Sequence, residues 1–174
     1  MPIDSQLKTK ADKKDGYRMK KRIFSAALGA VLITAALAGC NNNSNTLKDG
    51  TYHAQMKEAS HGWTDYVEIT VKNGKFDTVV YDAKNDAGDK KSQDEDYKKS
   101  MMEGNKNAGK PETYPADYSK KLADSLLEKQ DINQVDAVAG ATSSSKNFKA
   151  MVEALKSNMS KGKTDTVFVD APTQ

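Results

Sequence analysis

The sequence predicts an α+β domain in which two to three helices pack on one face of a small antiparallel sheet. Segments with the two-residue alternation of a strand come first, segments with helical spacing follow, and a short strand returns near the C-terminus. Such alternation is typical of strands with one buried face, and this order of elements favours helices grouped on one side of the sheet. About 120 residues take part, which is enough for one modest core.

The first three strands are predicted to form an antiparallel meander. Their ranges are 51–56, 64–72 and 75–82. In the middle strand Val67, Ile69 and Val71 alternate with polar residues, which indicates one buried face. Asn73-Gly74 then predicts a type I′ hairpin turn, because both residues tolerate a positive φ.

Two helices are predicted after a charged, solvated loop over 85–96. The first runs from about 94 to 102, because Gly104 and Gly109 interrupt the sequence beyond it. The second begins at Pro115, since proline suits the first helical position, and reaches about Lys129.

A third helix follows a run of small residues and hydroxyls, Asp136–Ser145. Its apolar residues recur at i, i+3, i+4 and i+7, namely Phe148, Met151, Val152 and Leu155. Thr142 or Ser143 is expected to cap its first turn. The N–H groups of that turn also suit a phosphate, which Gly140 and Ala141 would allow to approach the backbone. A strand over 164–170 is expected to rejoin the sheet.

The first 39 residues are predicted to be a leader, with a better start at Met19 than at Met1. A positively charged segment, 19–22, precedes the mostly apolar residues 23–38, as in a secretory signal. The apolar run is shorter than the ~20 residues that a spanning helix needs. Its ending, Leu-Ala-Gly-Cys, resembles a lipoprotein signal, which implies that Cys40 is lipidated and becomes the mature N-terminus.

Further boundaries follow from composition. Cys40 is the single cysteine, so the chain has no internal disulfide. Residues 40–47 are predicted to be the lipidated cysteine and a polar tether, 48–170 the folded domain and 171–174 a tail.

The basic charge of the chain belongs to the leader. Eight of the 27 Lys and Arg residues and three of the 24 Asp and Glu residues precede Cys40, which leaves 19 basic and 21 acidic residues and a net charge of −2. No basic stripe with interleaved aromatic residues is present, so nucleic acid is not an expected partner.

Other common sites lack support in the sequence. His53 and His61 are the two histidines, and they are not at a metal-ligand spacing, so no metal is expected. No Gly-x-Ser-x-Gly elbow and no phosphate-binding or dinucleotide-binding glycine pattern occurs.

The string Asp-x-x-x-Gly-Ala-Thr-Ser over 136–143, followed by an amphipathic helix, resembles the FMN-binding domain family, as does the opening Asp-Gly-Thr-Tyr over 49–52. In that family the threonine carries FMN through a phosphoester bond made by a dedicated flavin transferase. The resemblance implies that Thr142 is the attachment residue and that Asp136 is the acidic position recognised by the transferase. It also implies that Gly140 and Ala141 are the small positions. The residue before the glycine is usually Ser or Thr in the family, and here it is Ala139.

The flavin ring would need aromatic or sulfur contacts, because it is flat and partly apolar. Tyr97 and Met101 rank first among the candidates, since the stretch 90–97 with Met101 resembles a segment of flavin-carrying surface lipoproteins. Trp63 is next, as the single tryptophan. Ser143 and Ser144 are expected to add hydroxyls near the phosphate.

The resemblance implies an electron carrier rather than an enzyme, anchored to the membrane by a lipid on Cys40. Electrons would pass at the outer face of the cytoplasmic membrane from a membrane dehydrogenase and quinone pool to extracellular acceptors. Two alternatives remain open. One is a non-redox surface lipoprotein that binds a solute or a partner. The other is a peptide signal from leader residues 31–38, which resembles some bacterial sex-pheromone lipoproteins.

Overall fold

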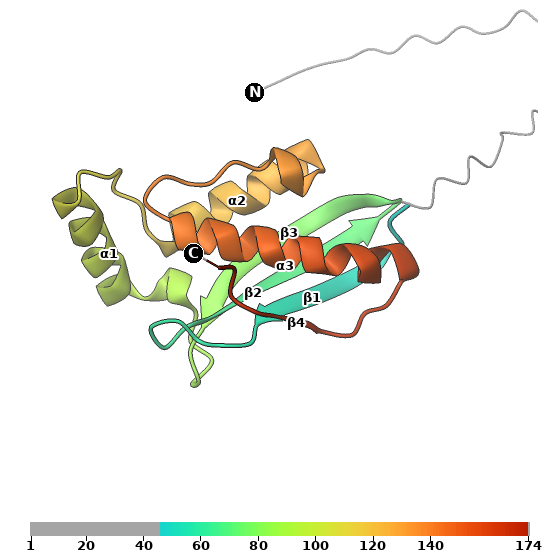
Figure 1. The fold of residues 1–174 in the computed structure, drawn as a ribbon, viewed down its shortest axis with the longest axis horizontal. Coiled ribbons are helices and arrows are strands. Elements are labelled where there is room, and N and C mark those ends of the chain that lie inside the picture. Colours follow the sequence, from blue (N-terminus) through green and yellow to red (C-terminus); the bar gives the residue numbers. More distant parts are fainter. Residues whose placement is uncertain (1–45, 174) are drawn as a thin grey trace, which may run out of the picture. The chain divides into compact units, whose positions relative to one another are not determined.

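A computed structural model describes residues 46–173 of the chain (Figure 1). The predicted leader, the start at Met19, the lipidation of Cys40, the peptide 31–38 and most of the tether lie outside the described residues. Within residues 46–173, no helix combines the length and the apolar composition that crossing a membrane requires.

The described chain forms a four-stranded sheet and three α-helices, which confirms the predicted α+β class. The strands are β1 (Gly50–Met56), β2 (Thr64–Lys72), β3 (Lys75–Lys84) and β4 (Val167–Val169). The helices are α1 (Glu95–Asn107), α2 (Pro115–Lys129) and α3 (Thr142–Lys161), with short 3-10 turns η1 (Lys91–Gln93) and η2 (Ile132–Gln134). The strand order is β3-β2-β1-β4.

The N-terminal meander is confirmed. β1 pairs antiparallel with β2, and β2 pairs antiparallel with β3. At the hairpin between β2 and β3, Asn73 and Gly74 have φ values of 53° and 73°, as the predicted turn requires.

The C-terminal strand corrects the prediction of a purely antiparallel sheet. β4 has three residues and pairs parallel to β1, with Ala54 opposite Val167, so the sheet is mixed. The reason lies in the end of α3, where the backbone N–H of Lys48 donates to the carbonyl of Met159 at 2.8 Å. Because α3 ends beside the beginning of β1, the chain that leaves it enters the sheet from the same end as β1.

α1 is longer than predicted and continues through Gly104. Asp94 caps its first turn by accepting from the N–H of Tyr97 at 2.8 Å. The helix ends near Gly109, whose φ is +63°, and the N–H of Lys110 donates to the carbonyl of Asn105 at 2.9 Å. One glycine inside a helix costs about 1 kcal/mol, whereas a glycine at positive φ ends it.

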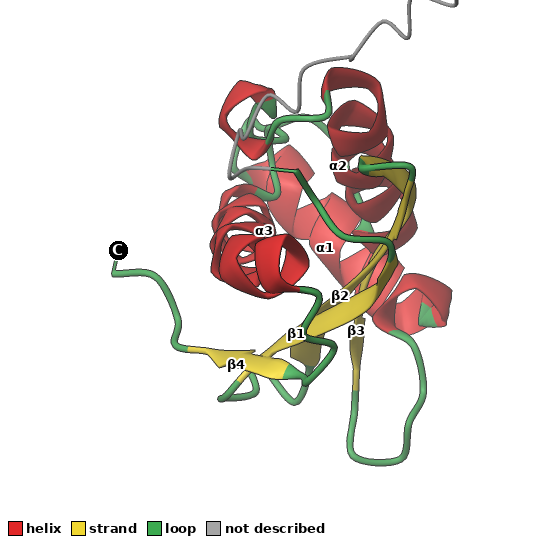
Figure 2. Ribbon diagram, turned by 90° about the vertical axis from the view of Figure 1, so that its right-hand side faces the viewer, coloured by secondary structure: helices red, strands yellow, loops and turns green. Residues whose placement is uncertain are grey.

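α2 and α3 cover the same face of the sheet (Figure 2), as predicted, and bury the core between the two layers. α3 packs on β1 and β2, and α2 packs on β3. Phe148, Met151, Val152 and Leu155 are fully buried, as the helical spacing indicates. Each large apolar side chain buried in this way contributes about 1.5–3 kcal/mol. α1 lies beyond the end of the sheet, beside the beginning of α3 (Figure 1).

Gln130 joins the end of α2 to the edge of the sheet. Its backbone is left-handed, with φ at 55°, and it terminates the helix. Its side-chain oxygen accepts from the N–H of Phe76 at 2.8 Å, and its side-chain nitrogen donates to the carbonyl of Phe76 at 2.9 Å. The amide therefore takes the place of a neighbouring strand at one residue of β3, an edge strand.

We expect Gln130→Ala to lower the free energy of unfolding by about 1–3 kcal/mol, because it leaves the polar groups of Phe76 without these partners. Gln134→Ala is the matched control. The Gln134 amide donates to Asp131 on the exposed surface, so its loss should change stability by less than about 0.5 kcal/mol. Urea denaturation measures both, and equal effects would contradict the role of Gln130.

Candidate functional site

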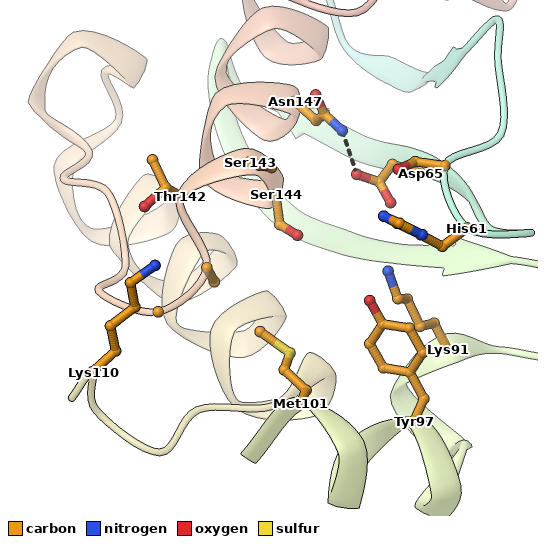
Figure 3. Close-up of a pocket in the computed structure, with 13 residues that line it drawn as sticks. His61, Asp65, Lys91, Tyr97, Met101, Lys110, Thr142, Ser143, Ser144 and Asn147 are labelled. Carbon is orange, nitrogen blue, oxygen red and sulfur yellow. Dashed lines mark hydrogen bonds between the residues drawn. The ribbon is translucent and has the colours of Figure 1, made fainter. Parts of the chain in front are cut away.

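A pocket of about 280 Å³ lies at the beginning of α3, facing α1 and the loop before β2 (Figure 3). Its lining combines cationic, aromatic, sulfur and hydroxyl side chains. The lining residues are Ser60, His61, Asp65, Lys91, Tyr97, Met101, Lys110, Gly140, Ala141, Thr142, Ser143, Ser144 and Asn147.

The first turn of α3 has no side-chain cap, so the prediction that Thr142 or Ser143 caps it is wrong. The helix begins at Thr142, and Ala141 occupies the cap position. The buried hydroxyl of Ser145 does the local bonding instead, because it accepts from the N–H of Val138 at 3.0 Å and donates to the carbonyl of Ala141 at 2.9 Å. Thr142 and Ser143 are exposed, and neither hydroxyl caps the helix. The first N–H groups of the turn have no partner within the helix.

Gly140 forms a close contact between this turn and the segment that follows α1. Its φ is +81°, and a Cβ added there would lie 2.8 Å from Cγ2 of Thr113 and 3.0 Å from Nδ2 of Asn105. Distances this short are not compatible with a side chain. Glycine is required at position 140 both for its backbone conformation and for this packing.

A hydrogen-bond network joins the same turn to the sheet. The Tyr81 hydroxyl on β3 lies 2.9 Å from Oδ2 of Asp65 on β2 and 2.9 Å from the carbonyl of Ser144, so its one proton is shared between them. Asn147 on α3 also donates to Oδ2 of Asp65, at 2.8 Å. Residues far apart in the sequence thus fix the orientation of the helix end.

Burial raises the pKa of the Tyr81 phenol well above its ordinary value, and the charge of Asp65 raises it further. Burial likewise raises the pKa of Tyr118, whose ring lies 6.3 Å from that of Tyr81. Both phenols are therefore neutral at physiological pH. Tyr81 acts as a hydrogen-bond donor to the carboxylate, which suits a structural role.

The opposite wall of the pocket carries Lys91, Tyr97 and Met101. The Lys91 nitrogen lies 4.3 Å from the centre of the Tyr97 ring. Trp63 meets Tyr97 edge to face, with ring centres 6.2 Å apart, but it does not line the pocket. Trp63 therefore contacts the wall through Tyr97, and its predicted contact with the flavin stays a prediction.

The structure brings together most of the residues predicted for the site. Gly140, Ala141, Thr142, Ser143, Ser144, Tyr97 and Met101 all line the pocket. Asp136 does not line it. It is exposed on the loop between η2 and α3, where its Oδ2 lies 3.3 Å from Nζ of Lys129. An exposed carboxylate outside the pocket is accessible to another protein, and its predicted recognition by a transferase stays a prediction.

Six polar lining residues were not predicted from the sequence: Ser60, His61, Asp65, Lys91, Lys110 and Asn147. Lys91 lies in the stretch 90–97 that resembles flavin-carrying surface lipoproteins, but nothing in the sequence indicates that its side chain is buried. Asp65 and Asn147 are 82 residues apart, and only the packing of α3 on β2 brings them together.

A second hollow, of about 520 Å³, lies at the other end of α3. It is lined by Leu47, Phe76, Ile132, Val152 and Met159, with polar residues between them. It is larger, but it contains none of the motif residues, so the chemistry points to the first pocket. Within residues 46–173, no group of three His, Cys, Asp or Glu side chains is placed to hold a metal ion.

Comparison with known proteins identifies the family. A model of the FMN-binding domain matches residues 61–156. A 15 kDa lipoprotein of Treponema pallidum is 34% identical over 139 residues, which cover 79% of this chain and 93% of that protein. The crystal structure of a Clostridium perfringens protein aligns with a TM-score of 0.64 at 34% identity, covering 72% of this chain and 99% of that one.

We expect Tyr81→Phe to lower the free energy of unfolding by about 1.5–3 kcal/mol at neutral pH, because the hydroxyl donates to a carboxylate. Tyrosines of the unfolded chain ionise near pH 10, whereas folded Tyr81 stays protonated. The stability that the hydroxyl adds is therefore complete below pH ~10 and is lost as the pH rises further, by up to about 1.4 kcal/mol per pH unit.

Urea denaturation of the wild type and of Tyr81→Phe at pH 8, 10 and 11 measures the difference between their free energies of unfolding. This difference should become smaller above pH 10. Tyr114→Phe is the control, because the Tyr114 hydroxyl forms no hydrogen bond with residues 46–173. A difference that stays constant with pH would contradict the assignment.

We expect Gly140→Ala to destabilise the domain more than Gly109→Ala. Both glycines have positive φ, 81° and 63°, but a Cβ at Gly109 would meet nothing within 4 Å. The backbone strain, about 1–2 kcal/mol, is common to both variants, and overpacking adds about 1–3 kcal/mol at Gly140 alone. Thermal and urea denaturation measure the loss of stability in each variant. Equal losses would show that the close contact of Gly140 has no energetic weight.

Proposed function

The chain belongs to the FMN-binding domain family, and from this premise we propose that it carries FMN on Thr142 as a lipid-anchored electron carrier. The observation that supports the proposal best is the exposed Thr142 at the uncapped first turn of α3, on the rim of a pocket with an aromatic and a sulfur side chain on its far wall.

The pocket residues near Thr142 fit a phosphate. The N–H groups of the first turn and the positive end of the helix dipole favour an anion. Lys110 lines the same pocket, and Figure 3 shows its ammonium pointing toward Thr142. Gly140 has no side chain that would keep the phosphate from the backbone. Together these groups would balance the negative charge of a phosphoester on Thr142.

The far wall fits a flavin ring. Tyr97 offers an aromatic surface and Met101 a polarisable thioether, which are common contacts of flat ligands. Trp63 keeps Tyr97 in place from behind. The thirteen lining residues therefore divide into a phosphate end at α3 and a ring end at α1, as a mononucleotide of this shape requires.

Attachment would be carried out by a separate flavin transferase. Oγ of Thr142 would form the new bond to phosphorus and lose its proton, while the leaving group would come from an activated flavin phosphate ester held by the transferase. The chain contributes an accessible hydroxyl on a fixed turn. The transferase would recognise Asp136, which is exposed, lies before this turn and is outside the pocket.

Bound FMN would supply the redox chemistry of the carrier. The chain holds the ring, shields one end of it and sets the charge around it. No side chain is needed to act on a substrate, so we propose a carrier rather than an enzyme. A membrane dehydrogenase and its quinone pool would be the donor, and an extracellular acceptor would take the electrons.

A lipid on Cys40 would hold the domain at the outer face of the membrane. The Treponema pallidum relative is named as a lipoprotein, which supports this anchor. Outside the cell free FMN is very dilute, and a reversible site is filled only while the ligand exceeds its dissociation constant. A covalent bond removes this dependence, which gives a physical reason for attachment. We propose no nucleic-acid partner.

We expect the mature chain, produced together with a flavin transferase, to show a fluorescent flavin band after denaturing electrophoresis and one FMN added in its intact mass. Thr142→Ala should remove both signals while the protein stays folded. Ser143→Ala is the matched control, because it removes a neighbouring exposed hydroxyl and should keep the flavin. Circular dichroism checks the fold of each variant.

Retention of the flavin by Thr142→Ala would remove Thr142 from this role. A wild-type chain that stays colourless beside an active transferase would favour the non-redox lipoprotein instead.

A further inference from the structure

Lys91 provides a cation on the pocket wall that the attachment of FMN to Thr142 does not use. Its side chain is 7% exposed, although lysine is rarely buried without a charged partner. Among residues 46–173, Lys91 forms no ion pair with a carboxylate. The carboxylate in the pocket, Asp65, accepts hydrogen bonds from Tyr81 and Asn147 instead.

The backbone around Lys91 is held in place by the sheet. Ser92 donates its N–H to Oδ1 of Asp82 at 3.1 Å and its hydroxyl to Oδ2 at 2.6 Å, and Asp82 is buried on β3. These bonds fix the η1 turn and direct Lys91 into the pocket, where Figure 3 shows its ammonium pointing toward His61. The position of the cation is thus determined by two elements and not by a mobile loop.

The Lys91 ammonium lies 4.3 Å from the centre of the Tyr97 ring, which gives it a cation–π contact. It has no hydrogen-bond partner among residues 46–173, and it remains open to the pocket. A cation that faces a pocket without a carboxylate partner is expected where it serves a ligand.

The position within the pocket indicates which part of the ligand Lys91 serves. Lys110 and the first turn of α3 already provide positive charge at the phosphate end. Lys91 lies on the opposite wall with Tyr97 and Met101, at the ring end. Two-electron, one-proton reduction gives the flavin ring one negative charge, and a fixed cation nearby stabilises that charge more than it stabilises the oxidised ring.

We propose that Lys91 raises the reduction potential of the bound flavin by favouring its reduced, negatively charged form. The proposal rests on the proposed function and adds the residue that tunes it. Lys91 is a positioning and tuning residue, which holds a charge at the ring end of the pocket and neither attaches the flavin nor transfers electrons.

Redox titration of the flavin-loaded mature chain tests the proposal with four proteins: wild type, Lys91→Met, Lys91→Arg and Lys98→Met. Lys98 is the matched control because it also lies over an aromatic ring, at 5.0 Å from the centre of Tyr114, but it does not line the pocket. Its substitution changes the net charge of the protein by the same amount.

We expect Lys91→Met to lower the equilibrium constant for reduction of the attached flavin at least tenfold, which is about 30 mV in reduction potential for a two-electron couple. Lys91→Arg should keep most of the wild-type potential, and Lys98→Met should keep all of it. The shift should persist in 1 M salt, because the bound ring would cover the ammonium, and salt screens a covered charge much less than an exposed one.

Equal potentials for Lys91→Met and Lys98→Met would overturn the proposal, and so would a shift that disappears in salt. A lower flavin content in Lys91→Met with an unchanged reduction potential would indicate that Lys91 binds the phosphate. That result would overturn the proposal as well. In each of these cases the wild type still carries flavin, so the proposed function stands. A wild type that takes up no flavin removes the proposed function and this inference with it.

Discussion

The proton that Tyr81 shares between Asp65 and the carbonyl of Ser144 holds the site together. It links β2, β3 and the first turn of α3 through one buried hydroxyl, and Asn147 adds a second link from α3 to the same carboxylate. A buried carboxylate without donors would be costly, so the helix end is stable only in the orientation that supplies them. That orientation places Thr142 on the rim of the pocket.

Close packing joins the beginning of α3 to α1. Gly140 lies against Asn105 of α1 and Thr113 of the segment after it. The Tyr97 wall is supported by Trp63 from behind and by the η1 turn, which Ser92 fastens to Asp82. The core between α3 and the sheet supplies the stability on which both walls rest, because it contains the largest buried apolar side chains of the domain.

The proposed attachment is compatible with this arrangement. Thr142 would need to be exposed only until it is modified, and its turn would need N–H groups that no side chain has taken. Ser145 bonds to Val138 and Ala141 from the buried side, so the exposed side of the turn would be free for a phosphate. Lys91, on the opposite wall, would act on the ring without taking part in attachment.

The sequence by itself determined the α+β class, the three-stranded meander with its Asn73-Gly74 turn and the buried stripe of α3. It also contains the motif over 136–143 that resembles the FMN-binding domain family. These features are local, because the two-residue and 3.6-residue periods and the conformational freedom of glycine act over a few neighbouring residues. Only the tertiary structure decided that β4 runs parallel to β1 and that Ser145, not Thr142 or Ser143, serves the first turn. It also decided that Trp63 lies behind Tyr97 and that Lys91 is buried in the pocket. Each of these depends on contacts between residues that are distant in the chain, and such contacts form only when the helices pack on the sheet.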